Sequence, residues 1–487
     1  MGYYVFGSED DADMIELLIE HPPGYEPERQ YIYNVIFGEF WGIGYQTRIG
    51  ADSAATVISV CGDTDVKRLV VHEGLFATPP DQWLTQGSLP HQPLNKWALP
   101  DILSGGVLVS SENPIIYGKR VTDNSYYAEH DGSIQLGLDT FGSAFFMLTR
   151  YEEVVKSDRD EHGRFPAGAS LAYQEGFLQR PIVNEYLEIL WRCMERLWPG
   201  LRRKGRKYSL CLSHDIDRPF AVAGMSWPLV LRSCGADLLR RRDPELACRR
   251  ISARRCARHG DFSNDPFNTF EFIMDVSEQY GLRSSFYFMA AATPSSYDVR
   301  YRIDDPWIRR LIRSVSERGH EIGYHGSYRS LAEPALTRLE LEALLGALYE
   351  EGVESAYGGG GRQHYLRWQA DSTWEVWDEA GLAYDSSLAF ADHLGFRCGI
   401  CYEYPTYGLR SRRCLSLRER PLTAMEGTAL SSRYMGLSPE EAYRCICRAN
   451  AECRRFDGQS ALLWHNSSLS SRHEKELYER VISALAK

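Results

Sequence analysis

The sequence has no apolar run approaching the ~18 consecutive residues of a membrane-spanning helix, and no internal repeat or long low-complexity tract. Cysteine is sparse: twelve residues in 487, without the spacing of a disulfide framework, so we expect mainly buried or free thiols. The stretch MGYYVFGSEDDADMIELL carries acidic residues where a secretory signal would be basic. We therefore expect no export signal, no transmembrane segment and a cytoplasmic protein.

An excess of positive charge is also absent. The formal net charge is −11, which argues against a nucleic-acid partner for the surface as a whole. One segment, around residues 219–262, departs from this balance because arginines cluster in it. As an insertion it could attract the phosphate of an activated sugar or contact a membrane surface, although charge runs of this kind are usually solvated helical hairpins.

The chain is longer than one hydrophobic core usually serves, and its 44% hydrophobic content is that of a globular protein. Apolar residues at helical spacing after Pro181 predict an amphipathic helix, and the basic stretch PGLRRKGRK follows it. We place a boundary there, between an N-terminal domain of unknown function over 1–204, with α/β or α+β structure, and a catalytic domain over 205–487.

From Lys207 onward, short β-rich runs alternate with longer helical stretches, which predicts an α/β fold with a parallel sheet or barrel. Polar residues follow several of the predicted strands. Asp215 and Asp217 end the first strand, and residues two apart share a strand face, so one could bind a cation while the other accepts a proton from water. An Asp-x-Asp turn is the alternative.

His325 ends the third predicted strand, where imidazole could bind zinc or a similar ion. His320 is five residues earlier, on the opposite strand face, and we expect it to be structural. Arg362 follows a glycine run that lacks the spacing of a nucleotide-binding loop, and its guanidinium could orient a carboxylate. His465, after another apolar run, could protonate a departing amine or be a strand-end histidine with a purely structural hydrogen bond.

Six stretches occur together in a characteristic order: LSHDID, RSSFYFMA, RGHEIGYHGSY, GRQHYLRW, YDSSLAFADHLGFRCG and LLWHN. Because of these stretches and their order, residues 207–487 resemble a NodB-like polysaccharide deacetylase domain of the carbohydrate esterase type. The whole chain resembles the subgroup with a long N-terminal domain of unknown function. The resemblance implies a distorted (β/α) barrel of the NodB type. It also implies an enzyme that hydrolyses an N-acetyl group on a carbohydrate or sugar precursor and releases acetate, with a divalent metal such as zinc.

The resemblance also implies roles for individual residues. Asp215 matches the base, Arg362 the arginine that orients it, His465 the acid, and Asp385 a residue that supports this acid. Asp217 and His325 match metal ligands. The position of the second ligand histidine holds Arg329, which has no lone pair to donate, so His214, His364 or water could complete the site. For substrate binding the expected residues are Tyr328, Arg329, Arg367 and Trp368.

Arg329 keeps two alternatives open. A metal-independent hydrolase of a non-sugar amide would not need the missing ligand. A catalytically silent carbohydrate-binding protein would tolerate its loss as well.

Overall fold

The structure is a computed structural model that describes residues 15–50, 54–62, 67–104, 112–290, 297–298 and 301–487. The chain divides into two compact units. Unit 1 comprises Met1–Lys156, Ile182–Arg206 and Ser411–Arg413, and unit 2 comprises Ser157–Pro181, Lys207–Arg410 and Cys414–Lys487. Unit 2 therefore includes a segment, Ser157–Pro181, that the sequence boundaries placed in the first domain. No helix in the described part of the chain combines the length and apolar character needed to cross a membrane.

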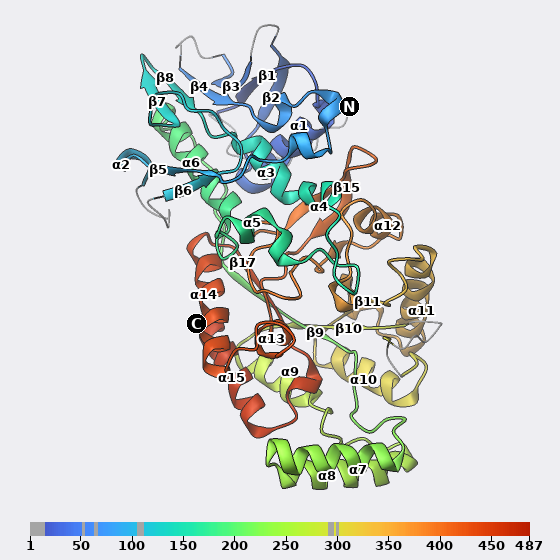
Figure 1. Ribbon diagram of the computed structural model, residues 1–487. Helices are drawn as coiled ribbons and strands as arrows, with labels where there is room; N and C mark the ends of the chain where they lie inside the picture. The colour runs from blue at the N-terminus through green and yellow to red at the C-terminus, as the bar shows by residue number, and fades with distance from the viewer. Residues whose placement is uncertain (1–14, 51–53, 63–66, 105–111, 291–296, 299–300) are drawn as a thin grey trace. The chain divides into compact units, whose positions relative to one another are not determined.

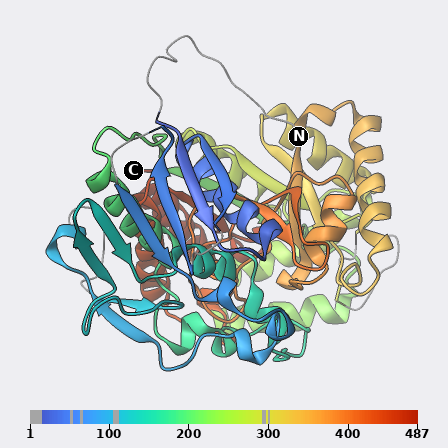
Figure 2. The ribbon, with the colours of Figure 1, turned by 90° about the horizontal axis from the view of Figure 1, so that it is seen from above.

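Unit 1 is built on a mixed six-stranded sheet in the order β2-β1-β3-β4-β8-β7. Several of its strands, in blue, lie side by side in Figure 2. A two-stranded ladder of β5 and β6 is separate from this sheet. The strands are β1 (Leu17–His21), β2 (Tyr45–Ile49), β3 (Ala55–Val60), β4 (Arg68–His72), β5 (Asn95–Ala98), β6 (Glu112–Ile115), β7 (Tyr127–His130) and β8 (Ser133–Leu136).

The helices of unit 1 bury apolar and aromatic side chains. The amphipathic helix predicted after Pro181 is confirmed as α6 (Ile182–Leu197), and α3 begins where the side chain of Asp139 accepts a hydrogen bond from the Gly142 backbone. The remaining helical elements are α1 (Glu26–Tyr33), the π-helix η1 (Asn34–Trp41), α2 (Asp101–Ser104), α3 (Thr140–Leu148), α4 (Tyr151–Val155) and the short 3₁₀ turns η2 (Leu75–Ala77), η3 (Pro80–Gln82) and η4 (Gln86–Ser88).

Unit 2 is built on a nine-stranded sheet in the order β14-β15-β13-β12-β11-β10-β9-β17-β16. The pairings from β15 to β16 are all parallel, so the carboxyl ends of these eight strands meet at one edge. The strands are β9 (Ser209–Asp215), β10 (Ser284–Phe288), β11 (Glu321–Gly326), β12 (Tyr357–Gln363), β13 (Tyr384–Asp385), β14 (Tyr404–Gly408), β15 (Arg413–Glu419), β16 (Ala424–Met425) and β17 (Gln459–Leu463).

Helices join these parallel strands, as crossover connections require. Helices α14 and α15, in red, lie side by side near the C-terminus (Figure 1). The α-helices of unit 2 are α5 (Leu171–Gln174), α7 (Trp227–Ala236), α8 (Pro244–Cys256), α9 (Phe270–Gln279), α10 (Pro306–Glu317), α11 (Ala335–Glu351), α12 (Thr373–Glu379), α13 (Glu426–Leu430), α14 (Pro439–Arg455) and α15 (Arg472–Ala486). The shorter turns are η5 (Ala167–Ala169), the π-helical η6 (Asp237–Arg241), η7 (Ala257–His259), η8 (Glu354–Ala356), η9 (His364–Leu366) and η10 (Asn466–Ser468).

The predicted α/β class is confirmed, but the sheet of unit 2 is a curled half-barrel and not a closed barrel. Its strand order ends at β14 on one side and β16 on the other, and no pairing among the described residues joins these two strands. The carboxyl ends of the parallel strands still lie along one edge of this open sheet, and parallel sheets commonly bind their ligands at that edge.

The glycine run before Arg362 allows β12 to pack closely between its neighbours. A Cβ atom at Gly361 would lie 1.8 Å from the carbonyl oxygen of Tyr324, and one at Gly360 would lie 2.4 Å from the ring of Tyr384. Neither position tolerates a side chain. The run is therefore explained by the packing of the sheet, with no need for a phosphate ligand.

Candidate metal and catalytic site

Polar side chains from four separate stretches of unit 2 converge at the carboxyl edge of its sheet. Asp215 is the last residue of β9, and His325 and Arg362 are register partners near the ends of β11 and β12. His465 follows β17, the other neighbour of β9 in the sheet. The parallel topology thus assembles residues as far apart in the chain as Asp215 and His465, which are separated by 250 positions.

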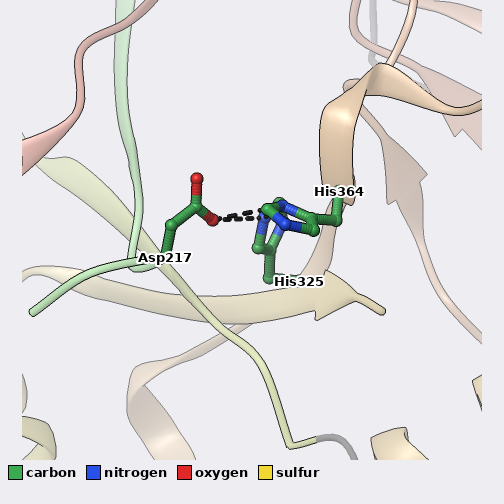
Figure 3. A group of neighbouring side chains, drawn as sticks. All are labelled: Asp217, His325 and His364. Carbon is green, nitrogen blue, oxygen red and sulfur yellow. Dashed lines mark hydrogen bonds and ion pairs between the residues drawn. The ribbon is translucent and has the colours of Figure 1, made fainter. Parts of the chain in front are cut away.

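Asp217, His325 and His364 form a compact group of potential metal ligands (Figure 3). Oδ1 of Asp217 lies 3.0 Å from Nε2 of His325 and 3.3 Å from Nδ1 of His364, and these two nitrogens are 3.1 Å apart. One carboxylate and two imidazoles are a donor set that zinc and related cations accept. The place left open by Arg329 in the sequence is therefore taken by His364, one of the two histidines that the sequence offered for it.

The hydrogen bonds of both imidazoles direct lone pairs toward the centre of this group. The Nδ1 atom of His325 donates to the carbonyl oxygen of Arg362, and the Nε2 atom of His364 donates to the carbonyl oxygen of Tyr297, both at 2.9 Å. A carbonyl can only accept, so these two nitrogens carry hydrogens. In the neutral rings the opposite nitrogens then carry lone pairs beside Asp217, as metal-ligating histidines require. The residues present therefore fit a divalent cation.

Electrostatics keeps the Asp217 carboxylate ionised. Burial raises the pKa of Asp217. When protons on the imidazoles take the place of a cation, the charge of His364 and hydrogen bonds from His325, His364 and His465 outweigh burial and hold this pKa well below its usual range. For His364, burial lowers the pKa and the charge of Asp217 outweighs it, so that the pKa is raised. The lowered pKa of Asp217 and the raised pKa of His364 have one cause, the attraction between the Asp217 carboxylate and a positive charge beside it.

Asp215 is held by a buried guanidinium. Arg362 donates from Nη1 to Oδ1 of Asp215 at 2.8 Å. The same guanidinium donates to the side chains of Ser213 and Ser386 and to the carbonyl oxygen of Ser386, at 2.8–3.0 Å. Because Arg362 is fully buried and each of its three guanidinium nitrogens donates a hydrogen bond, it has little freedom, and it fixes the position of the Asp215 carboxylate.

His465 is paired with a carboxylate on each side of its ring. Its Nδ1 atom lies 2.8 Å from Oε1 of Glu426, and its Nε2 atom lies 3.5 Å from Oδ2 of Asp217. Ser468 donates to the same oxygen of Glu426 at 2.9 Å. Burial lowers the pKa of His465, but the charges of Glu426 and Asp217 outweigh burial and hold it well above its usual range. The imidazole is thus set up to carry a proton.

A cavity of about 700 Å³ opens onto these groups. Asp215, Asp217, His364 and His465 all line it. Aromatic side chains form much of the remaining wall, and an apolar stretch between Pro219 and Leu229 forms another part of it. The aromatic lining residues are Phe220, Tyr297, Tyr301, Trp307, Tyr365 and Tyr434.

The segment Ser157–Pro181 of unit 2 holds the loop that carries His364. Tyr365 and Leu366 both have positive φ, 60° and 54°, a conformation that costs energy for residues other than glycine. Arg164 donates to the carbonyl oxygen of Tyr365 at 3.0 Å, and Arg367 donates to the carbonyl oxygen of His162 at 2.8 Å. Arg164 also lines the cavity. These bonds from outside the loop stabilise its strained backbone and so position His364.

Two residues expected in the site lie outside it. Both ring nitrogens of His214 are engaged elsewhere, with the carbonyl oxygen of Trp464 at 2.7 Å and the hydroxyl of Ser284 at 3.3 Å, so His214 is not part of the metal group. Asp385 accepts hydrogen bonds from the backbone and hydroxyl of Ser387. The carboxylates beside His465 are those of Glu426 and Asp217, so the expectation that Asp385 supports this histidine is corrected.

None of the four expected substrate-binding residues is among those that line the described cavity. Tyr328 stacks on Tyr297 with ring centroids 4.4 Å apart, and the guanidinium of Arg367 lies 3.8 Å from the centre of the Tyr328 ring. The side chains of Tyr328 and Arg367 therefore lie behind Tyr297, which forms part of the cavity wall. Arg329 is partly exposed and pairs with Glu333 at 2.6 Å, and Trp368 is only 1% exposed.

Sequence reasoning missed Glu426 and did not assign Arg164. Glu426 directly follows β16, so it has the same signal as Asp217: an acidic residue after a strand at the carboxyl edge. The strand has only two residues, too few to produce a β pattern in the sequence. For Arg164 the signal was weaker still, because its partner Tyr365 is 201 positions away.

A family model described as a family of unknown function (DUF7033) matches residues 17–199, a range that includes Arg164. No curated protein has significant sequence similarity to this chain. Among solved structures, a protein from Mycobacterium smegmatis designated a polysaccharide deacetylase is 16% identical with a TM-score of 0.37, over 58% of this chain and 85% of its own. Agd3, a carbohydrate deacetylase, is 9% identical with a TM-score of 0.36, over 97% of this chain and 84% of its own.

Proposed function

We propose that this protein is a metal-dependent amide hydrolase that removes an acetyl group from an N-acetylated sugar. The observation that carries the proposal is the arrangement at one cavity of three metal-ligand side chains, a carboxylate held by a buried arginine, and a histidine backed by a carboxylate. The order of the six sequence stretches that resemble NodB-like deacetylases supports the same reaction class.

Asp217, His325 and His364 would hold the cation. A divalent cation there would supply Lewis acidity, which favours deprotonation of water and polarises an amide carbonyl. The two backbone carbonyls that accept from the imidazoles fix the ring orientations before any cation arrives, so the cost of ordering the ligands is met during folding.

Asp215 is the proposed base. It lines the cavity two residues before Asp217, and Arg362 holds one of its oxygens. A carboxylate in this position accepts a proton from the water that attacks the acetyl carbonyl. Arg362 keeps the carboxylate oriented while that proton is transferred, because its own bonds to Ser213 and Ser386 do not change.

His465 is the proposed acid. As the carbon–nitrogen bond breaks, the imidazolium gives its proton to the leaving amine, and the acetyl group departs as acetate. Glu426 accepts from Nδ1 and so leaves the proton on Nε2 available on the side of Asp217 and the cavity. The cycle closes when Asp215 releases its proton to solvent and His465 takes one up.

The cavity suits a carbohydrate ligand. Its volume lies within the ~300–1,000 Å³ of small-molecule sites. Aromatic side chains such as Tyr297, Tyr365 and Trp307 offer flat apolar faces against which a sugar ring can pack. A metal-independent hydrolase and a catalytically silent binding protein were considered because Arg329 occupies the position of a ligand. His364 offers a third donor beside Asp217 and His325, so Arg329 no longer favours either alternative.

The proposal is tested by acetate release from N-acetylglucosamine and N-acetylgalactosamine oligosaccharides with the zinc-loaded protein. Asp215→Asn should lower kcat by at least about 100-fold, the usual contribution of a general base. Asp275→Asn, at an exposed carboxylate of α9, is the matched control and should leave turnover unchanged. Equal turnover by the parent and Asp215→Asn, or no acetate from any of these sugars, would contradict the proposal.

A further inference from the structure

The basic insertion forms a helical hairpin with one buried face. Helix α7 continues through the π-helical turn η6, and α8 returns beside it (light green in Figure 1). Val230 and Cys234 of α7 pack against Ala247 of α8, with Trp227 and Ile251 at the edges of this small core. The core uses only the facing sides of the two helices, so the outer side of α7 and η6 is left to solvent.

That outer side is unusually apolar for a surface. Leu231, Leu238 and Leu239 are 59%, 49% and 83% exposed. Isolated exposed apolar residues are ordinary, whereas Leu231, Leu238 and Leu239 lie within nine residues on one side of the helix and form a patch. Leu231 and Leu238 are seven residues apart, about two helical turns, so they project from nearly the same side.

The patch lies within a basic part of the chain. Residues 227–260 contain nine arginines and three acidic residues, a formal charge of +6 in a protein whose total is −11. Asp237 is buried and pairs with Arg241 and Arg250, and Asp243 caps the first turn of α8. Two of the three acidic residues therefore form contacts within the hairpin. The third, Glu245, is exposed. For the exposed Arg232, Arg242 and Arg255, the described residues contain no ion-pair partner.

From this combination we infer that the hairpin docks on an anionic lipid bilayer. Arginines attract lipid phosphates, and leucines beside them enter the boundary between headgroups and acyl chains. A nucleic acid would use the arginines but would leave the leucines in water. Helix α11 gives a comparison within the protein: its exposed Leu339 and Tyr349 lie among glutamates, so an anionic surface would repel that face.

The docking face is distinct from the cavity. Leu229 lies two residues before Leu231, so it projects from the opposite side of α7, where it lines the cavity together with Met225. The inference concerns binding alone and does not depend on the proposed reaction.

Co-sedimentation of the full chain with vesicles tests the inference. Vesicles of phosphatidylcholine alone are compared with vesicles that also contain phosphatidylglycerol. We expect binding only to the anionic vesicles, and weaker binding as salt is raised. Replacing Arg232, Arg242 and Arg255 by Glu should weaken binding by well over tenfold, since each basic residue near such a surface contributes roughly fivefold. Replacing Leu231, Leu238 and Leu239 by Ser should weaken it as well.

Two control variants match these changes elsewhere on unit 2. Arg302, Arg338 and Arg472, all exposed, are replaced by Glu for the same change in net charge, and Leu339→Ser is combined with Tyr349→Ser on α11. Circular dichroism confirms that every variant is folded. Equal losses in hairpin and control variants, binding that ignores anionic lipid, or tight binding of duplex DNA that the leucine variant retains would each overturn the inference.

Discussion

Nδ1 of His465 and Oε1 of Glu426 are 2.8 Å apart, and this contact links a strand end to the first residue of α13. It completes a chain of groups that runs from Glu426 through His465 to Asp217. Glu426→Gln keeps the size of the side chain and removes its charge. We expect kcat for acetate release to fall by roughly 10–1,000-fold with a small change in KM, because Glu426 acts through the proposed acid.

A double-mutant cycle separates this role from general damage to the fold. If Glu426 acts only through His465, Glu426→Gln should cost almost nothing further in a His465→Gln background. Independent losses that multiply in the double variant would contradict the assignment.

His364 and Arg329 offer a direct comparison between two candidates for one ligand position. His364→Ala should lower zinc affinity by more than roughly 100-fold, beyond the usual cost of losing a supporting residue. Arg329→Ala should leave affinity unchanged, because Arg329 pairs with Glu333 away from the group. Arg329→His should not tighten binding either. Isothermal titration with zinc measures all three, and an effect of Arg329→Ala equal to that of His364→Ala would refute the ligand set.

Arg164 should act on metal affinity through the backbone. Arg164→Ala removes the bond to the Tyr365 carbonyl and should weaken zinc binding by roughly 10–100-fold, as loss of an outer-shell contact commonly does. Arg433→Ala is the control, since Arg433 lines the same cavity but is exposed and lies near Glu161. Zinc titration of the two variants should separate them, and equal affinities would show that Arg164 does not position His364.

Asp385 should make stability depend on pH. Burial raises its pKa to about 6, whereas an unfolded Asp titrates near ~3.9. The folded protein therefore holds this proton more tightly, and the contribution of Asp385 to stability is most favourable below pH ~4 and falls by roughly 3 kcal/mol as the pH rises to about 6. Asp385→Asn removes this loss. Denaturant unfolding on both sides of this interval should show the variant gaining on the parent at higher pH, and a pH-independent difference would be contrary to the account.

Sequence patterns were sufficient to bring together the residues at or just after the ends of long, regular strands. Asp215, Asp217 and His325 lie after apolar runs with a clear strand period, and parallel topology then brings them together. The sequence made His364 one of two candidates for the third metal ligand but could not decide between them. Its position depends on the positive φ angles of Tyr365 and Leu366, and positive φ is not predictable from the sequence at residues other than glycine.

Other residues were beyond local reasoning for different physical reasons. Trp368 was expected to contact substrate, but its ring packs against Trp374 at a centroid distance of 4.9 Å, a tertiary contact that aromatic character alone does not reveal. The alternation of strands and helices predicted a parallel sheet or a barrel, and the resemblance to NodB-like domains implied a distorted barrel. That alternation is equally compatible with an open sheet, since closure depends on whether the two edge strands meet.

The central claim is that Asp217, His325 and His364 hold one divalent cation beside Asp215 and His465. An anomalous-scattering map from crystals of the zinc-loaded protein, recorded at the zinc absorption edge, tests it most directly. The account predicts one strong peak within bonding distance of the Asp217 carboxylate, Nε2 of His325 and Nδ1 of His364. A map with no peak there, or with zinc bound only at other residues, would contradict it.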